Sequence, residues 1–197
     1  LYLADCDCVE YMFLNMTCLG TGFQVVVLLR AGHGTPTSLA CLDAFTQHWV
    51  SWAGYPKEVV TDRGLNNRGG FCKELTAAGV YCASIGLEAP YQLGKVERHG
   101  DIWKTIAAKV VENKSIRGSR AMSTLAAEVT SVVNEKNRVG GSSPAQWVLG
   151  KLPRYGAGER GSDELAEQYG CLEERVDPTT IFGERMSIRH EAKKAYV

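Results

Sequence analysis

Asp62 stands where a carboxylate could bind a divalent metal ion. It ends the short apolar run 58–61 (EVVT), within the stretch 61–71 (TDRGLNNRGGF). In open sheets covered by helices, ligand sites form beyond the carboxyl ends of the strands. A glycine-rich turn keeps bulky side chains away from that edge, so a ligand's backbone can come close. The alternative is structural, because Asp and Gly after a strand often only make a turn.

A second carboxylate, Glu97, lies in the segment 86–104 (GLEAPYQLGKVERHGDIWK). The pattern predicts a loop over 86–94 and a helix from Lys95 to about Asn113. Glu97 is then expected in the first turn, where the helix dipole favours a negative charge. Helix capping alone would explain an acid at that position. The residues around Glu97 therefore have to distinguish a capping role from a functional one.

Those neighbours are cationic. Lys95, Arg98 and His99 flank Glu97, and Lys104 follows two turns later on the same helix face. A carboxylate among cations fits a place where phosphates meet Mg²⁺, because this ion takes one or two carboxylates plus substrate oxygens. Lys104 could equally lie on a solvated face, and His99 could contact phosphate or pack under the loop.

The elements that must position these residues follow a recognisable order. Residues 10–18 and 22–30 are expected to pair as an antiparallel hairpin, with 1–4 as the end of an earlier strand. Further strands are expected at 58–61 and 80–85. Helices are expected from Thr35-Pro36 to Gly54, and at 71–78, 95–113, 121–137 and 144–149. A meander followed by alternating helices and strands predicts an α/β fold, a mixed sheet flanked by helices.

Composition narrows the class of protein. The 197 residues suit one domain with a tail, and 45% of them are apolar. The 22 Lys and Arg balance the 22 Asp and Glu, so a nucleic-acid surface has to be a local patch. No apolar stretch reaches the roughly 20 residues that cross a membrane, so no membrane partner is expected.

The cysteines point to a reducing compartment. Seven are scattered along the chain without a CxxC pair, which argues against a disulfide framework and against zinc. Cys6 and Cys8, interleaved with Asp5 and Asp7, are either thiols on one strand face or metal ligands.

Together the motifs resemble the integrase catalytic core of retrotransposon Pol polyproteins, copia-like elements above all. Asp62 and Glu97, with 34 residues between them, resemble the second and third acids of that core. Residues 134–154 (NEKNRVGGSSPAQWVLGKLPR) are similar to the Ser-Pro and Gly-x-x-Pro-Arg stretch that follows it. The resemblance covers about residues 1–155 and implies an RNase H-like five-stranded mixed sheet.

The resemblance also implies the function. Asp62 and Glu97 would be catalytic acids that bind Mg²⁺ or Mn²⁺, and Lys95, Arg98 and Lys104 would bind DNA. The activity would be 3′-end processing and strand transfer, by a homo-oligomer acting on element ends and target DNA. Its place would be inside the cell, in the nucleus of a eukaryotic host. The alternatives are a decayed nucleic-acid-binding relic and an RNase H-like nuclease.

The family uses three acids, and the first belongs to the first strand. Counting back from the hairpin, we expect it just before Leu1. Asp5 and Asp7 are the only other candidates in reach, and we interpret Asp5 as a hairpin-turn residue whose carboxylate points to solvent. Residues 156–197 are expected to form a linker and an incomplete C-terminal helical segment, solvated rather than packed.

Overall fold

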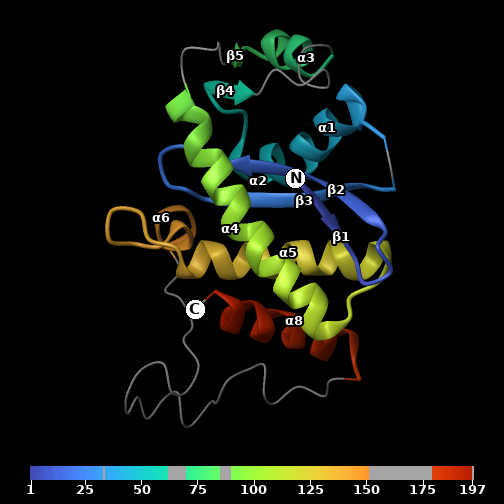
Figure 1. Cartoon of the computed structure of the whole chain (residues 1–197). Coiled ribbons are helices and arrows are strands. Elements are labelled where there is room, and N and C mark those ends of the chain that lie inside the picture. The colour runs from blue at the N-terminus through green and yellow to red at the C-terminus, as the bar shows by residue number, and fades with distance from the viewer. Residues whose placement is uncertain (33, 62–69, 85–89, 151–178, 197) are drawn as a thin grey trace.

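The computed structural model describes residues 1–32, 34–61, 70–84, 90–150 and 179–196. Among these residues the N-terminal half contains five strands: β1 Tyr2–Ala4, β2 Glu10–Thr17, β3 Gln24–Ala31, β4 Glu58–Thr61 and β5 Tyr81–Ser84. The helices are α1 Ser38–Phe45, the π-helical η1 Thr46–Val50, α2 Ser51–Ala53, α3 Cys72–Ala77, α4 Pro90–Lys114, α5 Gly118–Lys136, α6 Pro144–Leu149 and α8 Ile181–Ala195. The expected order of elements is confirmed (Figure 1).

The strands form an antiparallel meander and a separate parallel pair. The order β1-β2-β3 is antiparallel throughout, and Tyr2 pairs with Met12 while Thr17 pairs with Gln24. β4 and β5 pair in parallel, with Glu58 opposite Tyr81. The mixed α/β class is confirmed, but within the described residues the strands make sheets of three and two, not one sheet of five.

The meander is covered by helices on both faces because its side chains alternate between two apolar clusters. Val26 belongs to the cluster shared with α4, α5 and α8, which also contains Trp103, Val129 and Ile188. Val25 and Val27 pack instead against the cluster formed by α1, α3 and their neighbours. This period of two is what a strand buried on both faces requires, and it places α4 directly against the sheet.

The first helix begins two residues later than the sequence suggests. Thr37, not Thr35, is the N-cap, and its hydroxyl accepts a hydrogen bond from Ala40 N at 3.1 Å. The helical run then continues through η1 and α2 and ends at Gly54, whose φ of 73° suits glycine.

The C-terminal helix corrects an expectation. α8 is not solvated: Ile188 and Ala192 are buried in the apolar cluster shared with α4 and α5, and Met186 is buried as well. Figure 1 shows α8 beside α5 and the end of α4. Its arginines are also paired, because Arg185 and Arg189 both reach the buried carboxylate of Glu128, at 2.8 and 3.4 Å. The expected boundary near residue 155 lies outside the described residues.

None of the described helices combines the length and apolar character that a bilayer crossing needs.

Candidate active site

The candidate site is built on α4, which is fixed along its length by close packing. Trp103 is fully buried, its ring lies 5.2 Å from that of Phe13 on β2, and its indole N–H donates to Thr130 Oγ1 on α5 at 3.0 Å. At Gly100 a Cβ atom would lie only 2.9 Å from Leu1 Cδ2. α4 therefore approaches Leu1, the residue before β1, closely at Gly100, one turn after Glu97.

Glu97 is exposed on this helix, but not in its first turn. α4 begins at Pro90, so Glu97 is its eighth residue. The helix dipole acts mainly within the first turn, so it does not favour a negative charge at Glu97. Pro suits a first helical position because its missing N–H is not needed there. No hydrogen bond or ion pair joins Glu97 to another described residue, so its carboxylate oxygens are open to a ligand from outside that part of the chain.

The predicted cations divide between two sides of α4. Lys104 is exposed and seven residues from Glu97, within about 20° of the same face at 3.6 residues per turn. Arg98 is exposed on the adjoining side. Lys95 is about 160° away from Glu97, and its ammonium group donates to the carbonyl of Leu19 in the β2–β3 turn. Lys95 therefore does not share the helix face of Glu97 and Lys104.

A buried polar network holds the α4 segment that carries Glu97. Gln24 Nε2 donates to Asn15 Oδ1 at 2.8 Å and to the His99 carbonyl at 3.3 Å. Asn15 Nδ2 lies 3.5 Å from the carbonyl of Val96. The Asn134 side chain of α5 accepts from Gln24 N at 2.8 Å and donates to Gln24 O at 2.7 Å. β2, β3, α4 and α5 thus meet at one polar centre.

His99 packs beneath the hairpin rather than facing a ligand. Its ring would lie 3.2 Å from a Cβ added at Gly22, whose φ of 72° also favours glycine. Burial lowers the pKa of His99, and the charges of Lys95 and Arg98 lower it further. Its Nδ1 is buried without a hydrogen-bond partner among the described residues. Of the two interpretations of His99, the structure supports packing.

Asp5 does not point to solvent, which corrects the expectation for this residue. It follows β1 in the turn before β2, as expected, but it is buried and accepts hydrogen bonds from the backbone N–H groups of Asp7, Val9 and Gly118 at 2.9–3.0 Å. Tyr11 OH donates to it at 3.0 Å. Burial alone would raise the pKa of Asp5, but these hydrogen bonds lower it below its ordinary value.

This position also separates Asp5 from Glu97. Gly118 and Ile116, whose carbonyl accepts from Cys6 N, follow the C-terminal end of α4. From Glu97 to that end the helix rises about 26 Å at roughly 1.5 Å per residue. Two carboxylates bridged by a two-metal site lie far closer together than this, so Asp5 and Glu97 cannot share one.

Asp62 and the rest of the glycine-rich turn, residues 62–69, lie outside the described residues. No three His, Cys, Asp or Glu side chains within the described ranges lie together as a metal site. What the structure does offer to a metal is the exposed carboxylate of Glu97, a hard oxygen donor of the kind that Mg²⁺ prefers. The donor chemistry fits, and the strand β4 that leads to Asp62 is in place.

Solved structures share this fold. The chain matches the HTLV-2 integrase catalytic core domain in complex with magnesium, in its dimeric form, with a TM-score of 0.56 and 18% identity over 74% of this chain and 88% of that chain. The trimeric form gives a TM-score of 0.56 and 19% identity, over 74% and 89%. A chain of the simian T-cell lymphotropic virus intasome in complex with the PP2A regulatory subunit B56 gamma gives 0.50 and 18%, over 74% of this chain and 56% of that chain.

No protein-family model and no curated protein sequence matches the chain. The structural likeness defines the class: the fold is that of retroviral integrase catalytic cores, the RNase H-like fold. At 18–19% identity the likeness is one of fold.

Sequence reasoning did not identify one further group of arginine side chains, which lies near α4 and α5. Arg117 and Arg120 stand on either side of Gly118, and Arg185 of α8 lines the same pocket. The signal in the sequence for this group was the run 116–120 (IRGSR) at the start of a helix. Its pairing with α8 could not be predicted, because it depends on a contact between segments about 60 residues apart.

Proposed function

We propose that this chain catalyses metal-dependent polynucleotidyl transfer on DNA, as the integrase core of a copia-like retrotransposon Pol polyprotein. One observation carries the proposal: Glu97 presents a solvent-exposed carboxylate on the helix α4, in a fold shared with retroviral integrase catalytic cores. The spacing of Glu97 from Asp62 supports it from the sequence. One of the matching cores was solved with magnesium, which favours Mg²⁺ or Mn²⁺ as the cofactor.

The proposed roles follow from chemistry and position. Asp62 and Glu97 would hold the divalent ions, which supply Lewis acidity for attack and departure at a scissile phosphate. Arg98 and Lys104 would bind the DNA backbone beside Glu97, and Lys95 would stabilise the hairpin turn as well as add positive charge. In the first step water hydrolyses a phosphodiester near the DNA end and frees a 3′-hydroxyl. In the second, that hydroxyl attacks a target phosphodiester and releases a 3′-hydroxyl of the target strand.

The same proposal includes the assembly and the location. Matching cores are described in dimeric and trimeric forms and in an intasome, so we propose a homo-oligomer that binds element ends and target DNA. We further propose that β1–β3 and β4–β5 belong to one five-stranded sheet, and that the protein acts in the nucleus of a eukaryotic host.

A catalytically decayed nucleic-acid-binding relic is the second candidate. One observation favours it: Asp5, the acid that follows β1, is used structurally and lies far from Glu97. The relic would bind DNA without cleaving it. A plain RNase H-like nuclease would cleave DNA or RNA without joining strands.

A strand-transfer assay separates the three. It uses labelled duplex oligonucleotides with Mg²⁺ or Mn²⁺ and the chain together with the residues that precede Leu1 in the proposed polyprotein. The integrase proposal predicts joined products, lost in Asp62→Asn and in Glu97→Gln but kept in Asp101→Asn, an exposed acid one turn away. Cleavage without joining supports the nuclease, and DNA binding without any product supports the relic.

A further inference from the structure

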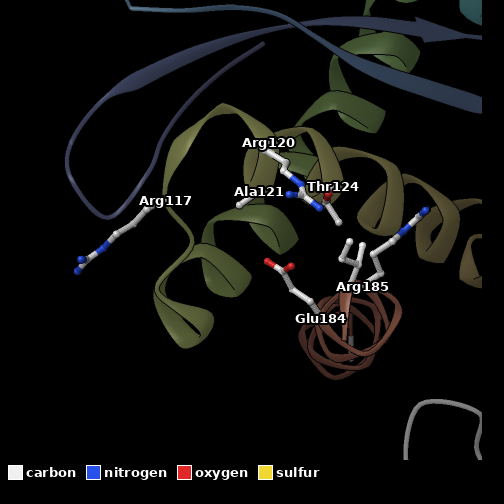
Figure 2. A pocket seen from close by; sticks show the side chains of 7 residues that line it. Arg117, Arg120, Ala121, Thr124, Glu184 and Arg185 are labelled. Carbon is white, nitrogen blue, oxygen red and sulfur yellow. The ribbon is translucent and has the colours of Figure 1, made fainter. Parts of the chain in front are cut away.

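A cavity of about 250 Å³ lies between the first turns of α5 and α8. Its lining comprises Arg117, Arg120, Ala121, Thr124, Ile181, Glu184 and Arg185. Figure 2 shows Arg120 and Thr124 on α5 close to the α8 residues, while Arg117 extends away from them at the rim. We call this cavity the arginine pocket. It is remote from Glu97, at the other end of α4.

The two helices run in the same direction, so their N-terminal ends lie together at this end of the bundle. Arg185 pairs with Glu128 at 2.8 Å, and Arg189, one turn later, donates to Ser131 at 2.7 Å and also reaches Glu135. The contacts advance along both helices together, so α5 and α8 are parallel neighbours. Their aligned dipoles place two positive ends beside the pocket.

Of the three arginines, Arg120 is the one that the described residues leave uncommitted. Arg117 pairs with Asp7 at 3.4 Å, and Arg185 is held by Glu128. Arg120 makes no ion pair or hydrogen bond with another described residue, and the same is true of the Thr124 hydroxyl. The pocket therefore presents a guanidinium fork and a hydroxyl donor to an incoming group.

We propose that the arginine pocket binds a phosphate of a nucleic-acid backbone, through Arg120 and Thr124. An arginine fork matches the oxygen geometry of phosphate, and the positive helix ends favour an anion. The pocket lies beyond the C-terminal end of α4, about 26 Å along the helix from Glu97 at about 1.5 Å per residue. A duplex covers that length in about eight base pairs at roughly 3.4 Å each. The inference takes the identity of the polymer, DNA, from the proposed function, but requires no catalysis.

Glu184 provides a test in which a substitution should increase the affinity for DNA. Its carboxylate faces the pocket from the first turn of α8, so it opposes a phosphate bound at Arg120. Replacing an acid on a merely solvated surface should leave DNA affinity unchanged, whereas Glu184→Gln should raise it.

The test is fluorescence anisotropy of a labelled 20-base-pair duplex with the whole chain, from about 50 to 200 mM NaCl, the range over which phosphate contacts weaken strongly. Arg120→Gln should weaken binding about two- to fivefold at the lowest salt, the range of an exposed ion pair. It should also reduce the slope of log K against log salt by about 0.9, one phosphate contact. Glu184→Gln should strengthen binding by a similar factor.

Arg30→Gln is the matched control, because Arg30 is exposed on β3 and lies outside the pocket; it should leave the slope unchanged. Thermal melting confirms that each variant is folded. If Arg120→Gln and Glu184→Gln behave like Arg30→Gln, the pocket proposal is wrong, even where strand transfer depends on Glu97. If the two variants shift affinity as described while strand transfer is absent, the pocket stands and the catalytic proposal fails. If the chain binds no DNA at all, the pocket proposal is also wrong. It is equally wrong if Arg120 is needed to bind polyglutamate but not to bind DNA.

Discussion

The carboxylate of Asp5 accepts a hydrogen bond from the backbone N–H of Gly118 at 3.0 Å, across 113 residues of sequence. This bond joins the turn between β1 and β2 to the first residue of α5. The acid nearest to the N-terminus is therefore a structural carboxylate at the far end of α4 from Glu97. The proposed catalytic acids are Asp62 and Glu97.

Asp5→Ala should destabilise the fold by about 2–4 kcal/mol, because several buried donors lose their acceptor. Urea unfolding followed by circular dichroism measures the change. Asp7→Ala is the control: Asp7 lies at the surface and pairs with exposed Arg117, so its loss should cost no more than about 1 kcal/mol. A stable Asp5→Ala variant that had lost only DNA cleavage would make Asp5 a catalytic acid instead.

His99 should make stability fall on mild acidification. Its pKa in the folded chain lies below the ordinary value of 6.5 because of burial and the charges of Lys95 and Arg98. As pH falls through 6.5 the unfolded chain takes up the proton first, so the free energy of unfolding decreases toward the folded-state pKa. Urea titrations at several pH values between 8 and 5 should show this slope, and His99→Gln should reduce it. Exposed His48 offers the comparison: an equal reduction in His48→Gln would exclude His99 as the cause.

Asn134→Ala should cost about 2–3 kcal/mol, because both backbone groups of Gln24 then lose partners in a buried environment. The polar network also holds α4, so amide hydrogen exchange around His99 should accelerate. Asn113→Ala, at an exposed asparagine, should change neither the free energy of unfolding nor the hydrogen exchange around His99. Unchanged exchange near His99 in Asn134→Ala would show that the network does not fix the Glu97 segment.

Glu128→Ala should loosen α8, because it leaves Arg185 and Arg189 without their shared carboxylate. Removing one partner of a buried ion pair lowers the free energy of unfolding by about 3–5 kcal/mol. Because Arg185 is half-exposed, the loss here should fall at the lower end of that range. Hydrogen exchange of the α8 amides is the measurement. Lys194→Ala removes a surface pair with Glu191 and should leave α8 protected. Equal protection in both variants would mean that the apolar contacts alone hold the helix.

The order of elements could be read from the sequence because periodicity is local. Residues 10–17 and 24–31 alternate between two buried faces, and the helix 144–149 has its Ser-Pro start and its terminal glycine within the pattern. The start of α4 was misplaced because Pro90 and Gly94 suggest a loop, whereas Pro is favourable in a first turn.

What could not be predicted depends on distant contacts. Charge suggested a solvated C-terminal helix, but Arg185 and Arg189 are paired with Glu128, about 60 residues earlier. Asp5 looked like an ordinary turn residue, since nothing local indicates that Gly118 lies beside it. The roles of Asp62 and Glu97 remain predictions from motif and spacing.

Manganese binding reports directly on a metal site shared by Glu97 and Asp62. In a titration of the whole chain with Mn²⁺, followed by paramagnetic broadening of backbone amide signals, the account predicts broadening around Glu97 and Asp62. Glu97→Gln and Asp62→Asn should each weaken binding by at least about tenfold, because even loss of a group that only supports a metal ligand costs about that much. Asp101→Asn should leave binding unchanged. Equal Mn²⁺ affinity in all four proteins, or broadening centred away from Glu97, would contradict a shared metal site at these two acids.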